Sequence, residues 1–153
     1  MKITLGDLAD DAVIALLNAH YQDMLNHSPQ ESVHAFDTSK LAADDVTFWT
    51  VWIEGELAGC GALKQLDNEH GEIKSMRTAA AHLRKGVAAE LLAHILQQAK
   101  QLGLTRVSLE TGTAPAFTPA LTLYQKSGFA HCLPFANYEL DPYSQFMSLE
   151  LIE

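Results

Sequence analysis

A change of hydrophobic period near residue 86 constrains the fold of this chain more than any other feature. Residues 47–78 are rich in β-branched and aromatic residues broken by short turns, which is typical of strands in hairpins. From about 86 to 102, apolar residues instead recur about every 3.6 positions, and Gly103 ends the pattern, so a long amphipathic helix is predicted. Residues 104–110 alternate like a strand. This order predicts a βαβ crossover between two parallel strands, 71–78 and 104–110.

The rest of the chain adds helices and strands around that crossover. Apolar spacing predicts helices over 8–26, which Ser28-Pro29 ends, near 39–43, and over 119–127, which Gly128 ends. Strands are predicted at 47–53, 57–66, 71–78, 104–110, 129–133 and 145–152. No repeat or linker divides the sequence, so we expect one domain, 1–153. Its class is α/β (α+β): a mixed sheet, antiparallel at its start, with one parallel pair and flanking helices.

Composition narrows the function classes. The chain has 153 residues, 48% of them hydrophobic, and a net charge of −9. An acidic chain is a poor nucleic-acid binder and is repelled by anionic membranes. No apolar run nears the roughly 20 residues that span a bilayer, and the N-terminus does not resemble a signal peptide. The two cysteines, Cys60 and Cys132, form no disulfide framework. We therefore expect a cytoplasmic protein with no nucleic-acid or membrane partner.

Charge is distributed unevenly along the chain. Residues 1–72 hold 13 acidic and 3 basic residues, whereas residues 73–153 hold 6 and 7. Within 73–89 there are four bases and no acid. Such an island favours a site for a small anion, although clustering on a solvated face would look the same.

The loop of the crossover, residues 79–89, lies inside this island. Gly86 lets the backbone approach a ligand closely, and the small residues Ala88 and Ala89 follow it. The N–H groups of a first helical turn carry partial positive charge, and Arg84 and Lys85 stand beside them. These features predict a diphosphate cradle that is neither a P-loop nor a Rossmann turn. The alternative is an ordinary helix start with exposed bases.

A second motif, Leu-Tyr-Gln-Lys-Ser-Gly-Phe at 123–129, joins a helix end to a strand start. Gly86 and Ala88 of the loop, together with Tyr124, Gly128 and Phe129, resemble the two motifs of the GCN5-related N-acetyltransferase (GNAT) superfamily. The resemblance covers about residues 45–130. The sequence departs from the family at two places. Leu83 stands where the family has Gln or Arg, with Arg84 one position later, and residues 117–120 lack the Asn that often opens the tyrosine helix.

The resemblance implies a fold and a co-substrate. In GNAT enzymes the parallel strands part, and the pantetheine arm of acetyl-CoA lies in the gap. It implies that the strand at Met76, Arg77 and Thr78 pairs with this arm, and that an N–H near Met76 stabilises the oxyanion. The diphosphate is expected on Arg84, Lys85, Gly86, Val87, Ala88 and Ala89. No metal is expected, and the family also allows a homodimer.

Two residues are the candidate catalytic groups. Tyr124 matches the family tyrosine that protonates the leaving thiolate, although it could be a packed aromatic. Glu72 stands where some members keep a base that deprotonates the amine, although it could be a solvated strand-end carboxylate. His70 is a weaker candidate base. Neither cysteine has the flanking residues of a nucleophile, so both are interpreted as small buried hydrophobes.

The acceptor side is less defined. The acidic first half favours a cationic amine, and Phe135, Tyr138 and Tyr143 are candidate pocket walls, although 134–143 could be a plain hairpin connection. His20, His27 and His34 are seven residues apart, but Ser28-Pro29 interrupts the helix, which argues against a metal site.

The resemblance thus predicts an enzyme that transfers acetyl from acetyl-CoA to a primary amine of a small molecule or a peptide by direct attack. Three alternatives remain: transfer of a longer acyl group or acylation of protein lysines, a non-catalytic acyl-CoA-binding module, and a generic nucleotide-binding α/β protein.

Overall fold

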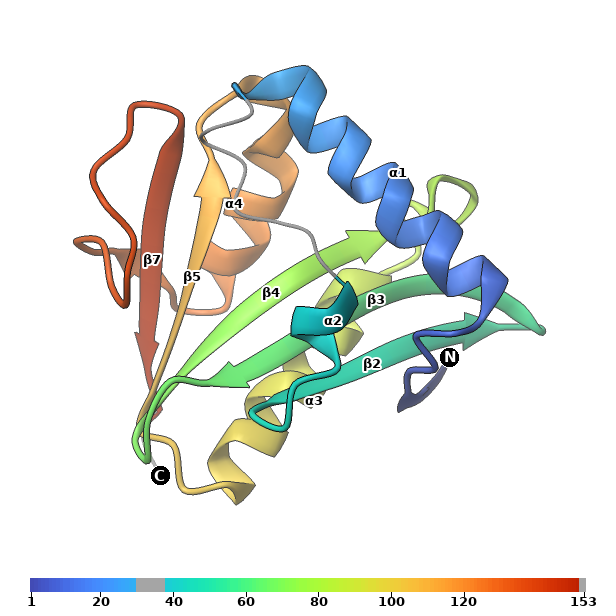
Figure 1. Cartoon of the computed structure of the whole chain (residues 1–153), viewed down its shortest axis with the longest axis horizontal. Helices are drawn as coiled ribbons and strands as arrows, with labels where there is room; N and C mark the ends of the chain where they lie inside the picture. The colour runs from blue at the N-terminus through green and yellow to red at the C-terminus, as the bar shows by residue number, and fades with distance from the viewer. Residues whose placement is uncertain (30–37, 152–153) are drawn as a thin grey trace.

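The computed structural model describes residues 1–29 and 38–151, so His34 lies outside the described residues. The described chain forms one seven-stranded sheet with helices on both faces (Figure 1). The strands are β1 (Lys2–Leu5), β2 (Val46–Ile53), β3 (Glu56–Gln65), β4 (His70–Thr78), β5 (Arg106–Gly112), β6 (Ala130–His131) and β7 (Ser144–Glu150). The helices are α1 (Asp11–His27), α2 (Thr38–Leu41), α3 (Val87–Gln101) and α4 (Thr118–Lys126), with short 3₁₀ turns η2 (Ala80–His82) and η3 (Pro115–Phe117).

The sheet order is β1-β2-β3-β4-β5-β7-β6, and only β4 and β5 pair in parallel. This confirms the mixed α/β class and the predicted crossover, with α3 as its helix. Helices α1 and α2 cover one face of the sheet, and α3 and α4 cover the other (Figure 1). No helix among the described residues is long and apolar enough to cross a membrane.

Helix α3 supplies the centre of the core. Its apolar stripe is buried against the sheet: Val87, Leu91, Leu92, Ile95 and Ala99. A Cβ atom at Gly61 of β3 would overlap the Met76 sulfur and would lie 3.1 Å from Leu91 Cδ2. Glycine at this position therefore allows α3 to pack directly on the sheet. A second apolar cluster, which includes the buried Cys60, lies under α1.

The sequence prediction differed from the structure at the sheet edges. Strand β1 was not predicted, because four residues are too few to show a period; they pair with β2 from Lys2 to Leu5. The strand predicted at 129–133 is only Ala130–His131, because Phe129 is buried beside Tyr124. The predicted strand 104–110 begins at Arg106 instead and extends to Gly112 along β7.

The parallel pair parts halfway along its length. Strands β4 and β5 pair only from His70 with Arg106 to Ile73 with Leu109. Beyond this point β4 carries a bulge: Cys60 pairs with Arg77 and Ala62 with Lys74, so Ser75 and Met76 share one position opposite Gly61. Ser75 has a left-handed φ of 57°. Bulges bend and twist a strand, so β4 follows β3 while β5 follows β7, and the two strands diverge.

Candidate active site

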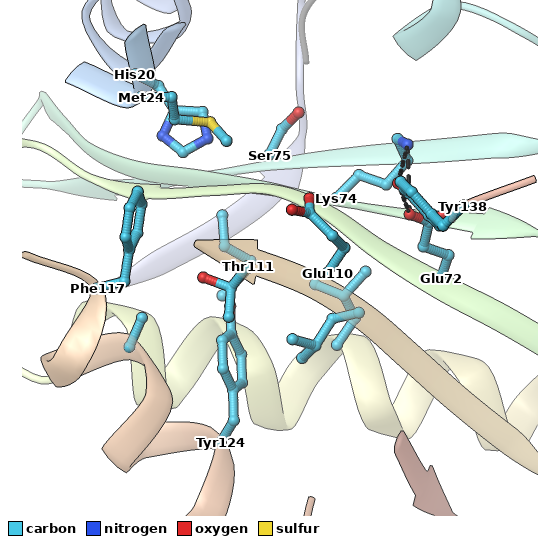
Figure 2. A pocket seen from close by; sticks show the side chains of 14 residues that line it. His20, Met24, Glu72, Lys74, Ser75, Glu110, Thr111, Phe117, Tyr124 and Tyr138 are labelled. Atoms are coloured by element: carbon cyan, nitrogen blue, oxygen red, sulfur yellow. Dashed lines mark hydrogen bonds and ion pairs between the residues drawn. The ribbon is translucent and has the colours of Figure 1, made fainter. Parts of the chain in front are cut away.

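The gap between β4 and β5 is a pocket of about 120 Å³ (Figure 2). Both strands line it beyond their last paired residues, α1 closes it on one side of the sheet, and α4 closes it on the other. Its lining residues are His20, Met24, Glu72, Ile73, Lys74, Ser75, Met76, Leu109, Glu110, Thr111, Phe117, Ala120, Tyr124 and Tyr138. Both predicted catalytic residues, Glu72 and Tyr124, are among them.

Tyr124 reaches the pocket from α4, on the face of the sheet that α3 covers (Figure 2). Its side chain is buried, and its ring packs edge-on against Phe129 with centroids 5.7 Å apart. Burial raises the pKa of the phenol well above its usual value, so the group stays protonated. Within residues 1–29 and 38–151 its hydroxyl has no hydrogen-bond partner. The hydroxyl is therefore available to donate a proton to a ligand.

Glu72 is buried in a polar cluster on the opposite face. The Tyr138 hydroxyl donates a hydrogen bond to Glu72 Oε2, and the Lys74 ammonium lies 3.4 Å from the same oxygen. Lys74 also donates to the Tyr138 hydroxyl over 3.4 Å. Burial and the charge of Glu72 raise the pKa of Tyr138 far above its usual value, so Tyr138 remains a donor. One oxygen of the Glu72 carboxylate is thus already engaged by two donors.

Glu110 is a second pocket carboxyl, which the sequence analysis missed. It follows Leu109, the last residue of β5 that pairs with β4. Burial, reinforced by the charge of Glu72, raises its pKa from 4.5 to about 7. In the sequence it reads as an exposed polar position of an alternating strand. Its place at the end of the crossover strand was the only available signal.

The predicted diphosphate loop has the expected geometry. Arg84 and Gly86 both have left-handed φ, 65° and 80°. In the described part of the chain, nothing lies within 4 Å of the position that a Cβ atom would take at Gly86. The first backbone bond of α3 runs from Glu90 N–H to Gly86 O. The N–H groups of Val87, Ala88 and Ala89 therefore have no intrahelical acceptor. Arg84 and Lys85 are exposed beside them. Together these groups form a surface suited to an anion.

The other predicted cofactor contacts lie on β4. Met76 lines the pocket, whereas Thr78 pairs with Gly59 in the ladder. The Arg77 guanidinium donates to Asp23 of α1 over 2.7 Å. It thereby lowers the pKa of that carboxyl. The Arg77 side chain is thus committed to α1, and Arg77 pairs with Cys60 in the β3–β4 ladder.

The histidines have separate roles. His20 lines the pocket, and its Nδ1 is buried with no hydrogen-bond partner among the residues that the structure describes. Burial, with the charge of Arg77, lowers the pKa of His20 to about 4, so it is neutral near pH 7. His70, the weaker candidate base, lies outside the pocket lining and hydrogen-bonds Ser108. His27 pairs with Asp23. In the described part of the chain no three potential ligands are grouped for a metal ion.

The three aromatic residues predicted to form pocket walls lie in different places. Tyr138 lines the pocket. Phe135 is buried between Tyr138 and Phe146, where it supports Tyr138. Tyr143 is largely exposed and is not part of the pocket lining.

A family model described as "Acetyltransferase (GNAT) family" matches residues 11–129. The chain belongs to the GNAT acetyltransferase family. It is 56% identical over 151 residues to the uncharacterized N-acetyltransferase YedL of Escherichia coli, covering 99% of this chain and 95% of that protein. It is 52% identical over 151 residues to YsnE of Bacillus subtilis, another uncharacterized N-acetyltransferase, covering 99% and 100%. An "IAA acetyltransferase" of Azospirillum brasilense is 35% identical over 92% of both chains.

Solved structures share the fold. A putative acyl-CoA N-acyltransferase from Klebsiella pneumoniae superposes with a TM-score of 0.79 at 27% identity, covering 99% of this chain and 97% of that one. A GNAT acetyltransferase from Elizabethkingia anophelis with acetyl-CoA bound superposes with a TM-score of 0.71 at 21% identity, covering 98% and 97%. The GNAT member described here is an acetyl-CoA-dependent N-acetyltransferase, as its sequence resemblance predicted.

The raised pKa of Glu110 predicts a pH dependence of stability. The folded protein holds this proton from about pH 4.5 to 7, whereas the unfolded chain loses it, so the contribution of Glu110 falls as pH rises through that window. Glu110→Gln cannot ionise. The difference in unfolding free energy, wild type minus Glu110→Gln, should therefore decrease from pH 5 to pH 8 in urea titrations. A constant difference would contradict the assignment.

Proposed function

We propose that this enzyme moves an acetyl group from acetyl-CoA to a primary amine of a small molecule or a peptide by direct attack, with no acyl-enzyme intermediate. The observation that carries the proposal is the arrangement of the split between β4 and β5. It brings a protonated Tyr124 to one face of the sheet and two carboxyls, Glu72 and Glu110, to the other. A thioester in the split would have a proton donor on one side and proton acceptors on the other.

The cofactor would lie along β4 and the start of α3. The N–H groups of Val87, Ala88 and Ala89, with Arg84 and Lys85, would hold the diphosphate. The pantetheine arm would replace β5 as the neighbour of β4 and pair with the backbone around Met76, Arg77 and Thr78. Met76 belongs to the bulge, where it shares with Ser75 the ladder position opposite Gly61. Its N–H is therefore our candidate for the oxyanion donor.

The amine must lose a proton before it attacks, because its free pKa is about 10.4. Glu110 would accept that proton, since its pKa of about 7 is matched to neutral conditions. The amine nitrogen would then bond to the acetyl carbon, the C–S bond would break, and Tyr124 would protonate the thiolate. The second proton, which the nitrogen loses as the amide forms, would restore the Tyr124 phenol. Glu72, the base predicted from sequence, would hold Lys74 and Tyr138 in place and keep the pKa of Glu110 high.

The acceptor would enter from the α1 face, where the carboxyls lie. A cavity of about 120 Å³ favours an unhindered amine. The described lining of this cavity holds two carboxyls and one ammonium, so an acceptor amine would be favoured in its cationic form when it enters. The Azospirillum brasilense relative is named for IAA, so IAA belongs among the acceptors to be tested.

The purified protein should release CoA thiol from acetyl-CoA when supplied with a panel of small amines, amino-terminal peptides, lysine peptides and IAA. We expect turnover with at least one unhindered primary amine, and mass spectrometry should show that the same amine has been acetylated. Thiol release with no acetylated amine would contradict direct transfer.

Tyr124→Phe removes the proton donor but keeps the ring that packs on Phe129. We expect kcat to fall by about 10²-fold, the lower range for a lost general acid, with the KM for acetyl-CoA nearly unchanged. Steady-state kinetics at saturating amine, which give kcat and the KM for acetyl-CoA, test this expectation. An unchanged kcat would exclude the acid role.

Glu110→Gln and Glu72→Gln distinguish the two carboxyls. If Glu110 is the base, Glu110→Gln removes the limb of the kcat–pH profile near pH 7. Glu72→Gln then keeps that limb and moves it to lower pH, because the Glu72 charge raises the pKa of Glu110. The reverse pattern would assign the base to Glu72.

A further inference from the structure

A chain of three side chains connects the start of β3 to the diphosphate loop. His82, in η2, is almost fully buried, with its side chain 5% exposed. Its Nε2 lies 3.0 Å from Glu56 Oε1, and its Nδ1 lies 3.0 Å from Lys85 Nζ. Glu56 is exposed at 73%, and Lys85 is also on the surface. A buried imidazole thus joins an exposed carboxylate to an exposed ammonium.

The bonding pattern fixes the direction of the chain. An ammonium can only donate, so Nδ1 of His82 must accept. The ring proton therefore sits on Nε2 and is donated to Glu56. Removal of Glu56 would free the ring to turn or to change tautomer, and the Nδ1 lone pair would no longer face Lys85. These hydrogen bonds connect Glu56 to Lys85 through His82.

Lys85 immediately precedes Gly86 and the free N–H groups of Val87, Ala88 and Ala89. A free lysine side chain samples many rotamers, so holding it in one position costs conformational entropy. Anchoring one of the three ammonium protons on His82 meets part of this cost before a ligand arrives. Two protons remain to bind phosphate oxygens.

We propose that Glu56 and His82 are positioning residues that hold the Lys85 ammonium for the diphosphate of acetyl-CoA. This inference rests on the proposed placement of the diphosphate at residues 84–89. It assigns a role in cofactor affinity to Glu56, which lies at the start of β3, 29 positions before Lys85 in the sequence.

The direction of the change in KM on removing the Glu56 charge distinguishes positioning of Lys85 from a simple electrostatic effect. Acetyl-CoA is an anion, so removing a nearby negative charge should tighten its binding. Glu56→Gln should instead raise the KM for acetyl-CoA about two- to threefold, the scale of one weakened hydrogen bond, and leave kcat unchanged. Glu54→Gln is the matched control: it removes the same charge from the same hairpin turn and should not raise KM. A lower or unchanged KM in Glu56→Gln overturns the proposal.

Two substitutions at His82 test the two halves of the chain. In His82→Asn the amide oxygen can accept from Lys85 where Nδ1 did, whereas in His82→Gln the amide N–H can donate to Glu56 but leaves Lys85 without its acceptor. We expect KM to rise more in His82→Gln than in His82→Asn. Equal KM values would contradict the anchoring of Lys85. Should burial prevent either variant from folding, the surface variant Glu56→Gln still decides.

The dependence on Lys85 gives the last test. Lys85→Met should raise KM about tenfold, as expected for a lost charged hydrogen bond, and Glu56→Gln should add nothing in that background. In an Arg84→Met background, Glu56→Gln should keep its full effect. Acetyl-dephospho-CoA keeps the diphosphate but lacks the ribose phosphate. The same dependence of KM on Glu56 and Lys85 with this analogue supports contact of Lys85 with the diphosphate, and loss of that dependence overturns the assignment. If Lys85→Met weakens binding but Glu56→Gln does not, only the proposed role of Glu56 and His82 is overturned. If the wild-type protein does not bind acetyl-CoA at all, the proposed function itself is overturned.

Discussion

The bulge in β4 is the constraint on which the site depends. Two residues, Ser75 and Met76, occupy one ladder position opposite Gly61, and the strand turns away from β5. With a regular ladder, the parallel pairing that ends at Ile73 and Leu109 would continue, and its backbone groups would satisfy one another. The bulge leaves a strand edge inside the protein that needs a partner. An extended, amide-bearing molecule such as pantetheine fits that need in the way that an added strand does.

The same opening explains the electrostatics. Glu72 and Glu110 come to lie in one partly buried pocket, which Lys74 of β4 also lines. Burial, reinforced by the charge of Glu72, raises the pKa of Glu110 to about 7. The Glu72 carboxylate itself is held by hydrogen bonds from Tyr138 and Lys74. A carboxyl that titrates near pH 7 is suited to proton transfer from an amine.

The local parts of this account were predictable from sequence, and the contacts between distant segments were not. The period change near 86, Gly86 and the Tyr124 motif indicated the crossover, the loop and the family, because each depends on neighbouring residues. Glu72 and Tyr138 are 66 positions apart, and Arg77 and Asp23 are 54 apart. Neither pair has a spacing signature. Glu110 was missed because an acidic residue in an alternating strand looks solvated, and only the divergence of β4 and β5 places it in a pocket. The bond from the Arg77 guanidinium to Asp23 of α1 is likewise a contact that local sequence does not indicate.

A crystal structure of the protein with acetyl-CoA tests the central claim most directly. The account predicts the pantetheine arm between β4 and β5, bonded to the β4 backbone near Met76, with the diphosphate at the N-terminus of α3 and the sulfur beside the Tyr124 hydroxyl. Acetyl-CoA bound elsewhere, or β4 and β5 paired through to Thr78 and Gly112 with the ligand outside, would contradict it.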